Sequence, residues 1–230
     1  MEKKRLEKME FEYEGIDYAL DFGIEQVKDL ARYSLNKRGE VNHIELVKFA
    51  LNKENKTGFI TDKKAKEITE ILTGGVEWGD DFLEFEEIIT YIISLFAQAI
   101  DTEAKLHEPA VITINEDNTV DLIVSGKEYK LKYNRKDVEE ALQANMMGSG
   151  SILELYMVGS TLIKTALLHT KKRPSVGVQD DILMAAWATM DNEDTKDDFP
   201  NMIQALISHM NDVLDDGGKK SRAVIKMKNR

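Results

Sequence analysis

The 230-residue sequence has 42% hydrophobic and 32% charged residues, a composition typical of a globular protein that can bury a core without disulfides or metal. It has no cysteine, which excludes disulfide bonds, thiol catalysis and thiolate metal sites. No apolar run approaches the roughly 18 residues of a membrane-spanning helix, and the charged start MEKKRLEK does not resemble a signal peptide. We therefore expect a soluble protein of the cytoplasm with no membrane partner.

The net charge of −11 is shared by two acidic halves. Residues 1–105 carry 15 basic and 23 acidic side chains, and residues 106–216 carry 10 and 19. Because acidic bodies repel the phosphate backbone, we expect no nucleic-acid partner. Residues 217–230 contain six basic and no acidic side chains, and this short charge run predicts a disordered basic tail.

The first half of the chain predicts a β-hairpin followed by four helices. Aromatic and aliphatic residues alternate over 11–22 around a turn at Glu14-Gly15, which is typical of a hairpin. Apolar residues then recur at helical spacing, with Trp78 in a loop before the last helix. The predicted helices cover 24–35, 41–51, 61–72 and 85–100. The last one carries an unbroken apolar stripe that must meet a core or a partner.

The second half restarts after a linker at 104–109. It predicts a three-stranded antiparallel meander, with strands at 111–114, 120–124 and 129–133. Four helices follow, and Pro174 interrupts the chain before the third of them. These helices are expected at 136–144, 152–169, 179–189 and 198–214.

The two halves share one pattern of residues. Aligning Gly126 with Gly15 places Leu131 on Leu20 and Val138 on Val27. The heptapeptide ELVKFAL at 45–51 matches TLIKTAL at 161–167, and the stripe at 85–96 matches 199–210. Three matches in the same order indicate a duplication. The predicted fold is a mostly helical α+β protein with two similar units, 9–103 and 110–216, each a small antiparallel hairpin or meander followed by about four helices.

No motif in the sequence points to catalysis, a metal or a cofactor. The four histidines have no metal-ligand spacing, and no glycine-rich phosphate loop is present. The acidic run DNEDTKDD has Lys196 where a calcium loop needs glycine and Met202 where it needs glutamate, so Asp198 is interpreted as a helix cap. We expect a protein that is not an enzyme and has no cofactor.

Methionine distribution and the apolar stripe suggest where a partner could bind. Seven of the ten methionines lie in the second unit, 110–216, and methionine suits both irregular cores and surfaces that adapt to partners. Met202 and Met210 align with apolar residues of the first-half stripe, which favours a core position for both. The Met146-Met147 pair lies beside glycines, which favours exposure. The candidate partner-binding residues are Met146, Met147, Met157, Ile93, Phe96 and Met210.

The segment VSGKEYKLKYNRKDVEEAL at 124–142, followed by helices and an aliphatic last helix, resembles the tail assembly chaperones of long, non-contractile-tailed bacteriophages. The likeness is clearest over 111–214, and 11–100 looks like a diverged second copy, whereas common family members have one such unit. The resemblance implies an assembly factor that binds the tape measure protein, keeps it soluble and helps recruit the tail tube protein. It also implies self-association into oligomers and absence from the finished virion.

Two other classes of function remain open on the sequence. An adaptor or regulatory protein could bind a smaller helical partner through the same apolar grooves, with the basic tail as a second contact. An enzyme with an unrecognised site would show a deep pocket with converging polar groups and perturbed carboxylates.

Overall fold

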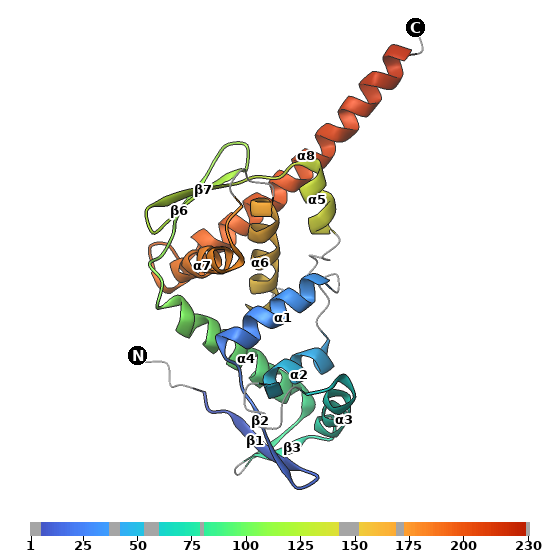
Figure 1. Cartoon of the computed structure of the whole chain (residues 1–230), viewed down its shortest axis with the longest axis vertical. Helices are drawn as coiled ribbons and strands as arrows, with labels where there is room; N and C mark the ends of the chain where they lie inside the picture. The colour runs from blue at the N-terminus through green and yellow to red at the C-terminus, as the bar shows by residue number, and fades with distance from the viewer. Residues whose placement is uncertain are drawn as a thin grey trace. The chain divides into compact units, whose positions relative to one another are not determined.

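The computed structural model describes residues 6–36, 42–52, 60–78, 81–142, 152–168 and 173–228, and the chain divides into two compact units, Met1–Glu103 and Ala104–Arg230. Both units are mostly helical and carry small antiparallel sheets (Figure 1). The predicted α+β class is therefore confirmed. The division falls at the start of the expected linker.

The first unit has two hairpins and four helices. The hairpin of β1 (Met9–Tyr13) and β2 (Ile16–Leu20) opens it, as predicted. The helices match the expected ones closely: α1 (Ile24–Asn36), α2 (His43–Asn52), α3 (Asp62–Leu72) and α4 (Phe85–Ala104).

A second hairpin, between α3 and α4, corrects the prediction of a loop around Trp78. It consists of β3 (Val76–Trp78) and β4 (Asp81–Leu83). Each strand has only three residues, which is too short for alternation to stand out from a loop. Gly75 begins the hairpin with a φ of +81°, a conformation that favours glycine.

The second unit starts with a meander whose register is antiparallel throughout. Its strands are β5 (Val111–Ile114), β6 (Val120–Val124) and β7 (Lys127–Leu131). The last strand lies two residues earlier than expected, because the turn after β6 needs only Ser125 and Gly126. Tyr133 then follows the strand, and its hydroxyl donates a hydrogen bond of 2.8 Å to the Leu162 carbonyl.

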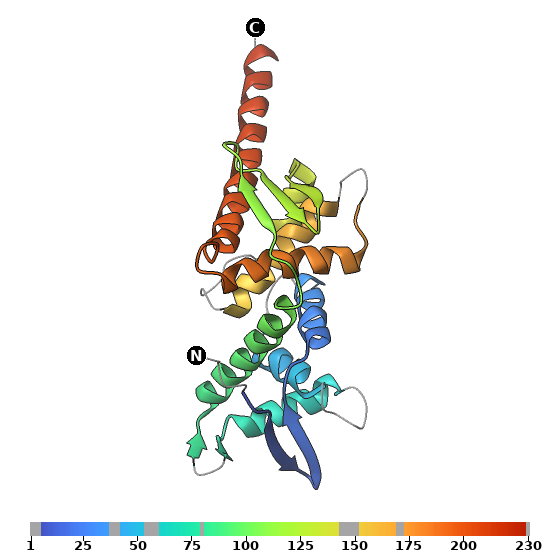
Figure 2. The same cartoon turned by 90° about the vertical axis from the view of Figure 1, so that its left-hand side faces the viewer.

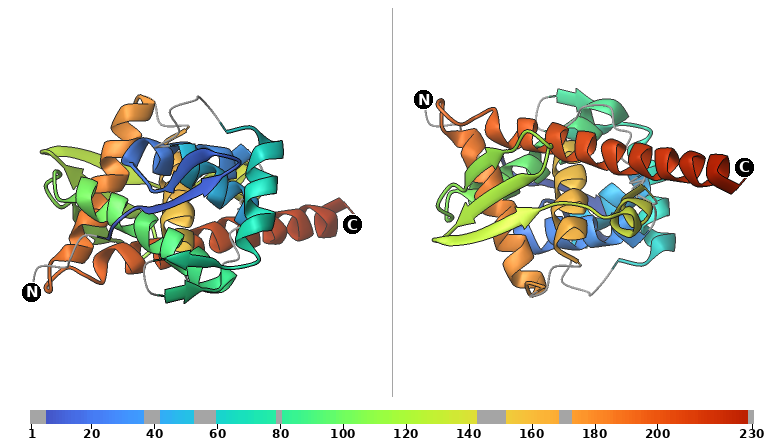
Figure 3. Two further views of the ribbon diagram at one scale, coloured as in Figure 1. Left: turned by 90° about the horizontal axis from the view of Figure 1, so that it is seen from below. Right: turned by 90° about the horizontal axis from the view of Figure 1, so that it is seen from above.

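Four α-helices and a short 3₁₀ helix complete this unit. They are α5 (Arg135–Leu142), α6 (Ile152–Leu168), α7 (Val176–Trp187), the 3₁₀ helix η1 (Ala188–Asp191) and α8 (Asp198–Lys228). The sheet contacts α8, and the views of Figures 2 and 3 show strand and helix side by side.

Helix α8 continues beyond the end expected at 214, so residues 217–228 of the predicted disordered tail are described as helical. Residues up to Lys228 are helical, despite the pair Gly217-Gly218. The residues after these glycines are mostly lysine, arginine, alanine and methionine, which have high helix propensity.

The same turn closes the β1–β2 hairpin of the first unit and the β6–β7 hairpin of the second. Glu14 and Gly15 have φ angles of 54° and 73°, and Ser125 and Gly126 have 49° and 73°. Positive φ at both central residues defines the two-residue turn that matches the twist of antiparallel strands. The alignment of Gly15 with Gly126 therefore reflects a shared backbone conformation.

The first helix after each of these hairpins begins with the same type of cap. The Gly23 amide donates to Gln26 Oε1 at 3.2 Å, and the Asn134 amide donates to Asp137 Oδ2 at 2.8 Å. In both cases a side chain three residues into the helix reaches back to the first amide, as in a capping box. These positions match in the alignment of the two halves.

The last helix of each unit buries one apolar face. Aligned pairs of this face are buried in both helices, whereas Ile93 is half-buried and its counterpart Ile207 is partly exposed. The buried pairs are Ile88 and Met202, Ile89 and Ile203, Ile92 and Leu206, and Phe96 and Met210. Burying each such side chain stabilises the fold by roughly 1.5–3 kcal/mol.

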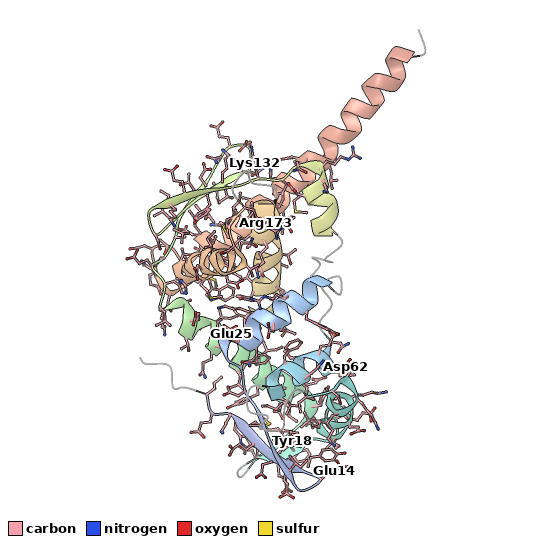
Figure 4. The ribbon with its side chains drawn as sticks, in the orientation of Figure 1. Glu14, Tyr18, Glu25, Asp62, Lys132 and Arg173 are labelled. Atoms are coloured by element: carbon pink, nitrogen blue, oxygen red, sulfur yellow. The ribbon has the colours of Figure 1, made fainter. Side chains whose placement is uncertain are left out.

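The second helix of each unit carries a lysine paired with an aspartate of the next helix. Lys48 Nζ lies 2.6 Å from Asp62 Oδ1, and Lys164 Nζ lies 2.9 Å from Asp180 Oδ1. Asp62, labelled in Figure 4, is largely exposed, whereas the Lys164 and Asp180 side chains are only 12% and 6% exposed. The two pairs share a position but differ in environment.

The start of each last helix packs against the second helix of its unit. In the first unit the His43 ring lies 5.3 Å from the Phe85 ring. In the second unit the aligned position is Gly159, and a Cβ there would lie 2.6 Å from Phe199 Cζ. Phe199 is fully buried and its ring lies 5.1 Å from Trp187, so it has little room to move.

Replacing Gly159 by alanine therefore tests the packing of the second core. We expect Gly159→Ala to lower the free energy of unfolding of this unit by about 1–2 kcal/mol, since overpacking outweighs the helix propensity gained. Urea unfolding followed by Trp187 fluorescence measures the change. Gly177→Ala is the matched control, because no atom lies within 4 Å of its added Cβ. Equal stability of the two variants would contradict this packing.

The two lysine–aspartate pairs allow a second test of stability. We expect Lys164→Ala to destabilise its unit by about 3–5 kcal/mol, because Asp180 stays buried without its ammonium partner. The more exposed pair predicts a loss of about 0–1 kcal/mol for Lys48→Ala. Thermal unfolding of both variants measures the difference. The double variant Lys164→Met/Asp180→Leu should regain most of the loss, and failure to do so would show that the ion pair is not its source.

Candidate partner-binding surfaces

A groove of about 460 Å³ lies in the first unit between the β3–β4 hairpin and helix α4. Its apolar wall consists of Trp78 from β3, Leu83 from β4 and Tyr91 from α4. The Trp78 and Tyr91 rings meet edge to face, with 4.7 Å between their centroids. All three side chains are half-buried, so each presents part of its surface to the groove.

The polar part of this groove comes from one side of α4. Thr90 Oγ1 donates to the Glu86 carbonyl at 2.8 Å, and Ser94 Oγ donates to the Thr90 carbonyl at 2.9 Å. Because these hydroxyls bond back to their own helix, they add little polarity to the surface. Glu86 and Glu87 supply the charged lining.

Two contacts hold the side chains around the groove in place, one within the β3–β4 hairpin at Gly75 and one to the segment before β1. The Phe82 ring lies against Gly75, and a Cβ added to Gly75 would come within 2.3 Å of Phe82 Cζ. Phe82 is nevertheless 60% exposed. The Tyr91 hydroxyl donates a hydrogen bond of 2.6 Å to the Glu7 carbonyl. The N-terminal segment of the unit thus holds one of the side chains that line the groove.

A second hollow, of about 410 Å³, lies on the β1–β2 hairpin and has a more polar lining. The Phe11 and Tyr18 rings stack there at 5.7 Å, beside charges of both signs. Near the turn, Lys64 Nζ lies 2.5 Å from Glu14 Oε2 and 4.3 Å from the centre of the Tyr13 ring. This ion pair lowers the pKa of Glu14, mainly through the hydrogen bond from Lys64. Figure 4 labels Glu14 and Tyr18 on this hairpin.

In the second unit, apolar side chains are exposed on the meander. Val111 and Ile123 face each other across β5 and β6, and both are exposed, as is Ile114 on the edge strand. Thr113 and Asp121 form the neighbouring pair of the same face. This face is small and partly polar, whereas the opposite face carries the buried Val120 and Leu122.

The residues predicted to bind a partner lie mostly inside the units. Phe96 and Met210 are buried in the last helices, and Met157 is buried in α6, so these three would reach a partner only if the fold opened. Ile93 is half-buried on α4. Met146 and Met147 lie outside the described residues. Partner binding by these residues stays a prediction.

Sequence reasoning missed Trp78, Leu83 and Tyr91 as surface residues. The signal that could have found them is the run after Gly74-Gly75, where VEW and DFL alternate on either side of a polar turn. A hairpin there turns Trp78 and Leu83 to one face, since side chains alternate along a strand.

Within the described ranges, no group of three or more histidine, aspartate or glutamate side chains is placed to hold a metal ion. Over the same residues, no helix combines the length and apolar character needed to cross a membrane. The acidic run at 191–198 forms the end of η1, a series of turns and the first residue of α8, Asp198.

Comparisons with known proteins give no indication of the function, so a proposal must be based on the sequence and the geometry. No family model matches the chain, and comparisons with curated proteins and with solved structures give no match either.

Proposed function

We propose that this protein is a non-enzymatic tail assembly chaperone of long, non-contractile-tailed bacteriophages. In this role it binds the tape measure protein, keeps it soluble and helps recruit subunits of the tail tube protein. It acts in the cytoplasm of the host cell, associates with further copies of itself and is absent from the finished virion.

The observation that carries the proposal is the segment at 124–142, which resembles that family. In the fold it forms the end of β6, the Ser125-Gly126 turn, β7 and α5. The first unit repeats this order with its own turn, strand and capped helix. A chaperone with two such units offers two surfaces to one long partner, which raises its overall avidity.

The surfaces and charge of the chain suit this role. A tape measure protein is expected to be long, helical and prone to self-association. The groove beside Trp78 can shelter apolar side chains of such a partner, and the exposed Val111 and Ile123 add a second apolar area. The net charge of −11 keeps a complex dispersed in solution.

Co-expression tests the proposal. We expect the tape measure protein encoded beside this chain to precipitate when expressed alone and to elute with this chain as one soluble complex on size exclusion. An unrelated acidic protein of similar size serves as the control for a general effect of charge. If this chain elutes alone while the tape measure protein still precipitates, the proposed function is wrong.

A further inference from the structure

The groove beside Trp78 lies in the most acidic stretch of the first unit. Between Lys66 and Lys105 the sequence has ten aspartate and glutamate residues and no lysine, arginine or histidine. Glu86 and Glu87 line the groove, and Asp81 and Glu84 are exposed beside it. The chain itself therefore supplies no cation from β3, β4 or α4 to balance these carboxylates.

Segments packed against this region add further negative charge. Burial raises the pKa of the Tyr91 hydroxyl above its ordinary value, and the charges of Glu7 and Asp21 raise it further. The nearest lysine of the described N-terminal segment, Lys8, pairs with Glu10 at 3.0 Å. The Tyr91 phenol in the wall of the groove thus lies near further carboxylates.

The apolar wall and the acidic rim together define the chemistry of a partner. A volume of about 460 Å³ falls within the range of roughly 300–1,000 Å³ that is usual for ligand pockets. It has room for anchor side chains of a partner rather than for a whole helix. Aromatic rings such as Trp78 and Tyr91 attract apolar anchors and cations alike.

We infer that this groove is a docking site for a basic amphipathic segment of another protein. One or two aliphatic or aromatic side chains of the segment enter between Trp78, Leu83 and Tyr91, and lysine or arginine side chains beside them pair with Glu86 and Glu87. The inference deepens the proposed function. Only the identity of the protein that carries the segment rests on that function.

Peptide binding to the full chain tests the inference directly. The probe is a tryptophan-free peptide of about four helical turns with leucine on one face and lysine on the other. Calorimetry gives its affinity, and the emission of Trp78 reports where it binds, because Trp187 is only 2% exposed in the second unit. We expect binding that shifts Trp78 emission and weakens as salt is added.

Two threonines of α4 provide a matched pair of variants. Both are exposed, and each hydroxyl donates to the carbonyl four residues earlier: Thr90 to Glu86 at 2.8 Å and Thr102 to Gln98 at 2.7 Å. Thr90 lines the groove and Thr102 does not. Arginine at either position has the same charge and a high helix propensity. We expect Thr90→Arg to weaken binding about tenfold or more, and Thr102→Arg to leave it nearly unchanged.

Several outcomes would overturn the inference. A peptide with glutamate in place of lysine that binds equally well would show that charge does not select the partner. Equal losses in the two threonine variants would show only a general attraction to an acidic protein. Binding seen only after removal of residues 1–5 or 217–230 would mean that the chain's own basic ends are the occupant. The peptide experiment contains no tape measure protein. Its failure would therefore overturn the docking site without changing the outcome of the co-expression test.

Discussion

The burial of one apolar face on the last helix of each unit is the constraint on which the rest of the structure depends. In α4 and α8 the buried positions follow the same spacing, and an aromatic residue between the strand and the first helix meets a ring of the last helix in each unit. The Phe22 and Phe96 rings meet at 5.4 Å in the first unit, and the Tyr133 and His209 rings lie 6.0 Å apart in the second. Hairpin, turn and first helix are positioned by the need to cover this face.

The sequence predicts these features well because each has a local cause. A glycine at a turn with positive φ, a side chain that caps a helix and an apolar stripe can all be read from a few neighbouring residues. Thr61 illustrates such a local cause, since its hydroxyl accepts the Lys64 amide at the start of α3. Locally determined elements were therefore predicted with nearly correct bounds.

Surfaces were predicted less well because exposure depends on contacts between distant parts of the chain. Composition alone could not separate a methionine of the core from one at a surface. The alignment of the two halves favoured a core position for Met210, which is buried, but gave no such indication for Met157, which is buried too. The short β3–β4 hairpin carries no strong periodicity, yet it brings Trp78 and Leu83 next to Tyr91. The groove exists only through this tertiary arrangement.

The two units share the pattern of one buried core but differ at their surfaces. The Lys48–Asp62 pair is exposed where Lys164–Asp180 is buried, and His43 occupies the position that Gly159 leaves open for Phe199. Such differences leave the shared helix face intact while the outer residues diverge.

Hydrogen–deuterium exchange of the full chain, resolved by mass spectrometry, tests the central claim most directly. If each unit is built on its last helix, the amides of 88–96 and 202–210 should be among the slowest to exchange in their own units. Rapid exchange along either segment, comparable to that of exposed turns, would contradict the account of two equivalent cores.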